Sequence, residues 1–73
     1  MVAVESTSIA RVGFEPAAQE LYVMYRDSGT VYVYAPVDEF TFRRLMRSDR
    51  KGVFVNREIK PNFDFREIQG DMP

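Results

Sequence analysis

Residues 21–34 read LYVMYRDSGTVYVY and carry the strongest secondary-structure signal in the chain. β-Branched and aromatic residues alternate on both sides of a central Asp27-Ser28-Gly29. Such alternation is typical of strands, and Asp-Ser-Gly is typical of the turn that joins two of them. The segment therefore predicts a β-hairpin, around which the rest of a 73-residue chain has to fold.

The length of the turn sets the register of the two strands. If the loop has two residues, 28–29, or four residues, 27–30, Tyr25 pairs with Tyr32. If the loop has three residues, with Gly29 in a bulge, Tyr25 pairs with Val31. A shift of one residue moves every side chain of a strand to the other face of the sheet.

This register decides whether Tyr32 and Tyr34 are core or surface residues. In the first arrangement both tyrosines join Leu21 on the buried face. In the second they join Tyr22 and Met24 on the opposite face, which would be an aromatic surface able to stack unpaired bases. Aromatic alternation is most often packing, so the sequence favours the buried arrangement.

Weaker signals extend the sheet on both sides of the hairpin. Residues 8–14 predict a strand with Ala10, Val12 and Phe14 on one side. Residues 53–55 read as a short strand and 56–60 as a turn or a single helical turn, while the alternation around residues 63–66 indicates a final strand. The ends, residues 1–7 and 69–73, carry few apolar anchors and are predicted to be flexible.

A helix is predicted from Asp38 to about Ser48. Asp38 suits the N-cap, and Glu39 in the first turn suits the helix dipole. At 100° per residue, Thr41, Phe42, Leu45 and Ser48 fall on one arc, which is the expected core face. We therefore expect one α+β domain over residues 8–68, a small antiparallel sheet in the order β-β-β-α-β, with one further C-terminal strand as an option and one helix packed on the sheet.

The composition excludes most catalytic chemistry. The chain has no Cys and no His, so it has no thiol nucleophile, no imidazole base and no Cys/His zinc site. Its acidic residues are dispersed and its four glycines stand alone. We expect a protein that is not an enzyme and uses no cofactor or metal. Without an apolar leader or membrane span, the default expectation is a cytoplasmic monomer.

The formal net charge of −1 conceals a division along the chain. Residues 1–42 carry two basic and six acidic groups (−4), residues 43–66 carry eight basic and three acidic groups (+5), and Glu67 and Asp71 add −2. The positive block coincides with the predicted helix, whose outer arc holds an aromatic residue and three arginines, Phe40, Arg43, Arg44 and Arg47.

An aromatic side chain among arginines can stack on bases and contact phosphates. Arg50, Lys51 and Arg57 could extend such a surface, and the sequence therefore suggests RNA or other nucleic-acid binding. Two alternatives stay open. The arginines can be an ordinary solvated helix face, with Phe40 tucked against Pro36 and Val37. The domain can also be a protein-interaction adaptor that docks through exposed aromatic and methionine side chains, namely Phe40, Met46, Tyr22 and Met24.

A series of short motifs in a fixed order spans residues 9–63. They are an apolar residue followed by Val-Gly-aromatic, a Leu-x-Val-x-aromatic strand, a Tyr-x-Tyr pair, an aromatic and a Leu in the helix, and a closing Lys-Gly-x-aromatic-x-Asn-x-x-Ile-Lys segment. The matching residues are Ile9, Val12, Gly13, Phe14, Leu21, Val23, Tyr25, Tyr32, Tyr34, Phe42, Leu45, Lys51, Gly52, Phe54, Asn56, Ile59 and Lys60.

In these motifs the chain resembles the KTSC domain, a short bacterial module named for its place at the C-terminus of some lysyl-tRNA synthetases. The resemblance implies a domain of unknown function whose fusion partner suggests RNA of the tRNA type. It implies structural roles for Tyr32, Tyr34, Gly13, Gly52, Phe54, Asn56 and Ile59. Two positions depart from the family pattern, since Val37-Asp38 replaces the usual Val-Pro and Arg50 replaces a serine.

Overall fold

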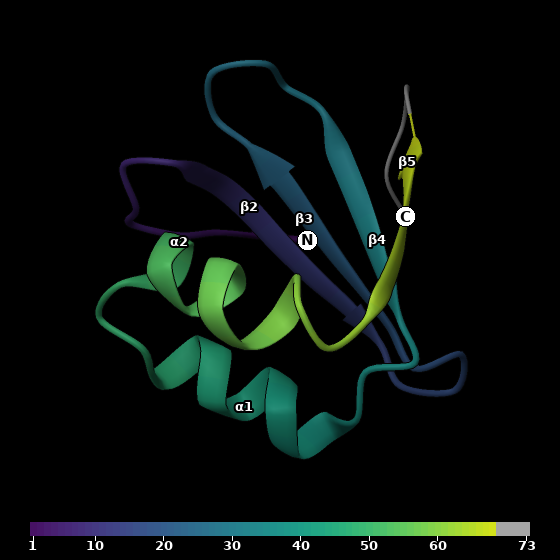
Figure 1. Cartoon of the computed structure of the whole chain (residues 1–73). Coiled ribbons are helices and arrows are strands. Elements are labelled where there is room, and N and C mark those ends of the chain that lie inside the picture. Colours follow the sequence, from purple (N-terminus) through teal and green to yellow (C-terminus); the bar gives the residue numbers. More distant parts are fainter. Residues whose placement is uncertain (69–73) are drawn as a thin grey trace.

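The computed structural model describes residues 1–68, which form a five-stranded antiparallel sheet with a helical layer on one face (Figure 1). The sheet strands lie in chain order, and the helices are inserted before the last strand. This confirms the predicted α+β class. The elements are β1 (Val2–Ala3), β2 (Ile9–Glu15), β3 (Glu20–Tyr25), β4 (Val31–Ala35), α1 (Glu39–Arg47), α2 (Lys51–Phe54), the π-helical turn η1 (Val55–Ile59) and β5 (Asp64–Ile68).

The β3–β4 hairpin closes through a four-residue loop, Arg26–Gly29. The amide of Tyr25 donates to the carbonyl of Thr30 at 2.9 Å, and the amide of Gly29 donates to the carbonyl of Tyr25 at 2.9 Å. Gly29 has a φ of +70°, a conformation that glycine adopts without steric cost. The four-residue loop starts one residue earlier than the four-residue loop expected for the buried arrangement, so the register differs by two residues.

A shift of two residues leaves every side chain on its expected face. Leu21 pairs with Tyr34 and Val23 with Tyr32, so both tyrosines face the helical layer. Tyr34 is fully buried, and Tyr32 is half-buried and packs against the core. The preference for the buried arrangement is therefore confirmed, although the expected Tyr25–Tyr32 pairing is wrong.

The N-terminal strand begins with a change of register that the sequence did not indicate. The pairing of β2 with β3 shifts between Ile9 and Arg11, which leaves Ala10 as an extra residue. Ile9 is consequently fully buried together with Val12, whereas Ala10 is only half-buried. The prediction that Ala10 shares one side of the strand with Val12 and Phe14 is therefore corrected, because Ile9 takes that place in the core.

Part of the N-terminal segment predicted to be flexible belongs to the sheet. Val2 pairs with Val12 and Ala3 with Arg11, which makes β1 an edge strand. The predicted domain start at residue 8 is therefore too late, because residues 2–3 pair within the same sheet. The predicted tail, residues 69–73, lies outside the described residues.

The first helix agrees with its prediction. The Asp38 carboxylate accepts a hydrogen bond from the amide of Thr41 at 3.1 Å. The Thr41 hydroxyl first, and the Thr41 amide second, lower the pKa of this carboxyl. Leu45 is fully buried, and Phe42 stacks on Phe14 of β2 with ring centroids 4.7 Å apart. The cap and the core arc therefore both orient α1 as expected.

The predicted strand over residues 53–55 is wrong, because these residues are helical. A Val-Phe-Val run has a local preference for strand, yet Val55 and Ile59 are both fully buried in the core. On a strand Val53 and Val55 would share one face, yet Val53 is 43% exposed and Val55 is fully buried. A helix separates these two and places Val55 and Ile59 on one face, so packing overrides local preference here. α2 and η1 follow each other directly and lie beside α1 (Figure 1).

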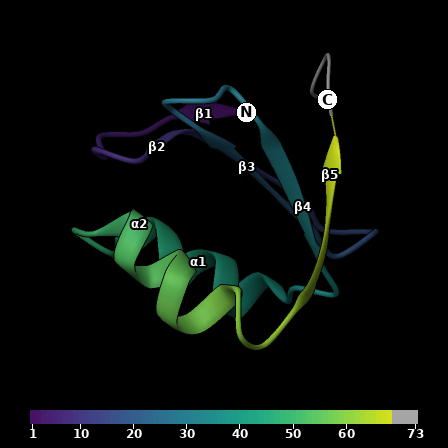
Figure 2. The ribbon, with the colours of Figure 1, turned by 45° about the horizontal axis from the view of Figure 1, so that its top comes forward.

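The core lies between the concave face of the sheet and the helical layer (Figure 2). In the view of Figure 2, β5 runs away from the helices at the far edge of the sheet. The main core cluster takes residues from every element except β1, α2 and β5, and its members are Ile9, Val12, Leu21, Val23, Tyr34, Val37, Leu45, Val55 and Ile59. Val31 and Val33 of β4 are also buried but lie outside this cluster.

Candidate functional site

The outer surface of the helical layer carries an aromatic side chain and four arginines, and we call it the basic helical face. It consists of Phe40, Arg43, Arg44, Arg47 and Arg57, all of them exposed. The α1 members lie opposite the buried Leu45 on the helix, and Phe40 is 68% exposed. The alternative in which Phe40 tucks against Pro36 and Val37 is therefore wrong.

Two of these arginines have carboxylate partners. Arg43 pairs with Glu39 at 2.7 Å, and Arg44 pairs with Glu58 of η1 at 3.4 Å. The Arg44 guanidinium also lies over the ring of Phe54, 5.4 Å from its centroid. Both ion pairs are about half exposed, so each stabilises the fold only weakly.

Arg47 and Arg57 make no ion pair within residues 1–68. Arg47 lies one turn beyond Arg44 on α1, and Arg57 lies between the buried Val55 and Ile59, so its side chain points away from the core. These two guanidinium groups are accordingly available to an anionic partner.

The structure places Arg50 and Lys51, the predicted extension of this surface, in two different environments. The Lys51 ammonium donates to the carbonyl of Ser48 at 2.8 Å, so it closes the turn between α1 and α2. The amide of Arg50 donates to the Ser48 hydroxyl at 3.1 Å, and the side chain of Arg50 lines a cavity. Arg50 therefore belongs to a second site.

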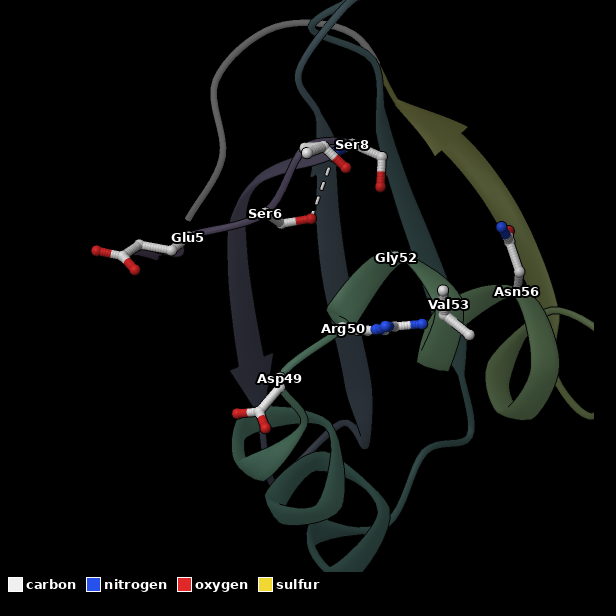
Figure 3. Close-up of a pocket in the computed structure, with 9 residues that line it drawn as sticks. Glu5, Ser6, Ser8, Asp49, Arg50, Gly52, Val53 and Asn56 are labelled. Atoms are coloured by element: carbon white, nitrogen blue, oxygen red, sulfur yellow. Dashed lines mark hydrogen bonds between the residues drawn. The ribbon is translucent and has the colours of Figure 1, made fainter.

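This cavity has a volume of about 550 Å³ and lies between the N-terminal loop and the start of α2 (Figure 3). Seven of its nine lining residues have polar side chains, and Gly52 and Asn56 contribute to it from one face of the helical segment. The lining residues are Glu5, Ser6, Thr7, Ser8, Asp49, Arg50, Gly52, Val53 and Asn56.

Gly52 allows the N-terminal loop to approach the helix closely. A Cβ at this position would lie only 2.1 Å from the Ser8 hydroxyl oxygen, although the Ser8 Cβ is 3.5 Å away. The lack of a side chain at Gly52 thus sets the distance between the two walls of the cavity.

We expect this contact to be measurable as a coupling between the two positions. Gly52→Ala should stabilise the protein by less than a helical Gly→Ala change usually does, because the added methyl group forces the Ser8 hydroxyl to rotate away. In a Ser8→Ala background the same change should stabilise by about 0.5–1 kcal/mol, since alanine is the better helix former. Urea unfolding of the two single variants and the double variant measures the coupling. Equal effects of Gly52→Ala in both backgrounds would contradict it.

The other motif residues occupy different environments. Ile59 is fully buried, and Phe54 is half-buried beneath Arg44. A Cβ at Gly13 would lie 2.6 Å from the Met1 side chain, so Gly13 accommodates the N-terminus. Asn56 is exposed at the cavity. The predicted structural role fits the packing of Ile59, Phe54 and Gly13. The exposed Asn56 side chain is instead placed to contact a ligand in the cavity.

The side chains proposed for a protein-docking surface are mostly engaged. Met46 packs against the core, and Met24 is half-buried. The Tyr22 hydroxyl donates to Glu20 at 2.9 Å, which raises the pKa of Tyr22. Of the four side chains named from the sequence, only Phe40 projects freely.

The described residues contain no cluster of three or more acidic residues placed to hold a metal ion. None of their helices is long and apolar enough to cross a membrane.

A family model, the KTSC domain, matches residues 5–63. The chain belongs to the KTSC domain family. A crystal structure of a KTSC domain protein from Yersinia pestis superposes with a TM-score of 0.88 and 31% sequence identity, covering 93% of this chain and 94% of that chain. A protein of Tsukamurella paurometabola is 36% identical over 63 residues, which is 86% of this chain and 92% of the relative.

The family match confirms the resemblance found in the motifs and extends it to residue 5. It therefore includes the loop of the cavity, residues 5–8, which the motif comparison from residue 9 left out. Both walls of the cavity lie within the KTSC domain.

Proposed function

We propose that this KTSC domain is a non-catalytic module that binds RNA, such as tRNA or a single strand, through the basic helical face. The observation that carries the proposal is that Arg47 and Arg57 are exposed and have no ion pair in residues 1–68, in a helical layer that also carries the exposed ring of Phe40 and the Arg44–Phe54 pair. Guanidinium groups bind phosphates with two parallel hydrogen bonds, and an exposed ring stacks on a base. The surface offers both.

The two ion pairs on this face do not prevent binding. Glu39 and Glu58 are partners of exposed arginines, and such pairs contribute little to stability in water. The phosphates of an RNA strand can replace Glu39 and Glu58 as partners of these arginines, because the strand carries a denser negative charge and its binding releases counterions. The occurrence of KTSC domains on some lysyl-tRNA synthetases is consistent with an RNA partner.

Binding is tested with a fluorescein-labelled single-stranded RNA of 12 nucleotides and with unfractionated tRNA, using anisotropy at low and physiological salt. We expect the logarithm of the affinity to fall linearly with the logarithm of the salt concentration. The double variant Arg47→Gln, Arg57→Gln should bind about tenfold or more weakly at low salt. Its salt slope should be smaller by about one for each phosphate contact removed.

Arg11→Gln is the matched control for charge, because Arg11 is also exposed but lies on the sheet. It should change the affinity by less than about twofold at physiological salt, where distant charges are screened. The proposal is overturned if no RNA binds at protein concentrations of about 1 mM in low salt, above the range usual for non-specific binding. Equal losses in Arg11→Gln and in the Arg47, Arg57 double variant would also overturn it.

A further inference from the structure

The cavity between the N-terminal loop and α2 is distinct from the basic helical face, and its two walls are held in place by the fold. On the loop side, the Arg26 guanidinium donates to the carbonyls of Ser6, Val4 and Ile9 at 3.1–3.4 Å. The Ser6 hydroxyl accepts hydrogen bonds from the amides of Ser8 and Ile9 at 3.3 and 3.2 Å. A cavity wall fixed by these contacts loses little entropy when a ligand binds.

The opposite wall is fixed by the turn between α1 and α2. Ser48 accepts hydrogen bonds from the amide of Arg50 and the ammonium of Lys51. This turn presents Asp49 and Arg50 to the cavity, and neither side chain has an ion pair or hydrogen bond in residues 1–68. Two opposite charges are therefore displayed at one site without satisfying each other.

Figure 3 shows how the polar groups are distributed. In this view the carboxylates of Glu5 and Asp49 lie at one end, while the Arg50 guanidinium extends toward Val53 and the Asn56 amide lies at the other end. The Ser6 and Ser8 side chains lie between these two ends. The cavity thus offers acceptors at one end and donors at the other.

A ligand that fits this arrangement has hydroxyl donors at one end and an anionic group at the other. A simple anion does not fit well, because two carboxylates line the same cavity. A nucleotide does, since a guanidinium binds its phosphate and a carboxylate accepts from its ribose hydroxyls. The volume of about 550 Å³ is in the usual range for small-molecule sites.

We propose that the cavity binds a 5′-phosphorylated ribonucleoside, with its phosphate on Arg50 and Asn56 and its ribose hydroxyls on Asp49. This chemistry is shared by a free nucleoside monophosphate and by the 5′-terminal nucleotide of an RNA strand. The site uses none of the residues of the basic helical face, so either site can be lost without the other.

The test is an NMR titration of the ¹⁵N-labelled protein with adenosine 5′-monophosphate. Amide shifts are expected in residues 5–8, 49–53 and 56. Adenosine, which lacks the phosphate, and the 2′-deoxy monophosphate, which lacks one ribose hydroxyl, should each bind about tenfold more weakly, because each omits a hydrogen bond to a charged group.

Two variants test which residue contacts the phosphate and which contacts the ribose. Arg50→Gln should weaken the binding of the monophosphate about tenfold or more and leave the binding of adenosine unchanged. The control Arg11→Gln, on the sheet, should leave the binding of both unchanged. Asp49→Asn should bring the ribo- and deoxyribo-monophosphates to nearly equal affinity. The heteronuclear spectrum of each free variant shows directly whether it is folded.

A pair of RNA strands, one with a 5′-phosphate and one with a 5′-hydroxyl, distinguishes the two sources. If the 5′-phosphate strengthens RNA binding and this gain disappears in Arg50→Gln, the ligand is the 5′ end of a strand. If the two strands bind with equal affinity, the ligand is the free nucleotide. The proposal is overturned if the monophosphate causes no shifts at about 10 mM, well above typical ligand affinities, or if its shifts fall on the basic helical face and disappear in Arg47→Gln. Neither result changes the salt-dependent RNA binding expected of Arg47 and Arg57.

Discussion

Replacing Leu45 with alanine should lower the free energy of unfolding by about 2–5 kcal/mol. Leu45 is fully buried and is the residue through which α1 enters the core. Truncation removes its apolar contacts and leaves a cavity that the surrounding side chains fill only in part. Domains of this size have a stability of about 5 kcal/mol, so the variant should be close to unfolding at room temperature. Urea titration followed by circular dichroism measures the loss.

Phe40→Ala is the matched control, because it truncates another apolar residue of the same helix. Phe40 is 68% exposed, and its replacement should change the free energy of unfolding by less than about 0.5 kcal/mol. The same variant should weaken RNA binding if the ring stacks on a base, at about 1–3 kcal/mol per stacked base. Similar losses of stability at positions 40 and 45 would contradict the orientation of α1.

The stability of the protein should fall steeply above about pH 10, and Tyr34 should be a main cause. Burial raises the pKa of Tyr34 far above its ordinary value of 10.0, and the hydrogen bond to the Tyr25 hydroxyl, 3.1 Å away, raises it further. Above pH 10 the unfolded chain loses this proton while the folded protein keeps it. Each further pH unit therefore favours unfolding by about 1.4 kcal/mol for this one residue. The contribution is fully present below pH 10.

Tyr34→Phe removes this titration and should produce a crossing of two stability curves. Near pH 8 the variant should be less stable by about 1 kcal/mol, because it loses one buried hydrogen bond. Above about pH 11 it should become more stable than the unmodified protein, because phenylalanine has no proton to retain.

Tyr25→Phe deletes the other hydroxyl of the same hydrogen bond but leaves Tyr34 buried, so most of the steep decline should persist. Burial also raises the pKa of Tyr25, and its hydrogen bond with Tyr34 opposes that shift. Urea unfolding between pH 8 and pH 12 gives all three curves. Parallel curves for Tyr34→Phe and the unmodified protein would show that Tyr34 ionises normally.

The parts of the fold that could be predicted are those encoded over a few neighbouring residues. Asp38 caps α1 because a short polar side chain precedes an amphipathic stretch, and Leu45 is buried because it lies on the apolar arc. The inward direction of Tyr34 was favoured over the alternative register because aromatic alternation is most often packing. Each of these depends on local periodicity, which the sequence displays directly.

The errors occurred where distant packing decides the local structure. The hairpin register depends on a loop that starts at Arg26, and Arg26 is also held by the N-terminal segment through Ser6. Residues 53–55 prefer strand locally but are helical, which leaves Val53 exposed and buries Val55 in the core together with Ile59. The inward turn of Ile9 depends on a bulge opposite β3. No neighbouring residue signals any of these.

Of the two candidate sites, one could be predicted from the sequence and the other could not. The basic helical face was predictable because Phe40, Arg43 and Arg47 share one side of a single helix. The cavity was not, because Ser8 and Gly52 are far apart in the sequence and meet only after folding. The spacing of Gly52 and Asn56, four residues apart, would have placed both on one face if that segment had been predicted as a helix.

The order of the strands has a consequence for how the chain folds. β1, β2, β3 and β4 pair with their immediate neighbours through short loops, whereas β5 pairs with β4 only after the whole segment 36–63 has folded back. Closing that long loop costs the most entropy, so we expect the N-terminal meander to form early and β5 to dock last. Until then the edge of β4 is exposed, and its Val-Tyr-Val-Tyr sequence is well suited to pairing with another chain. When β5 docks, it pairs with the exposed edge of β4 and becomes the new edge strand. Its charged side chains, Asp64, Arg66 and Glu67, discourage pairing with another chain.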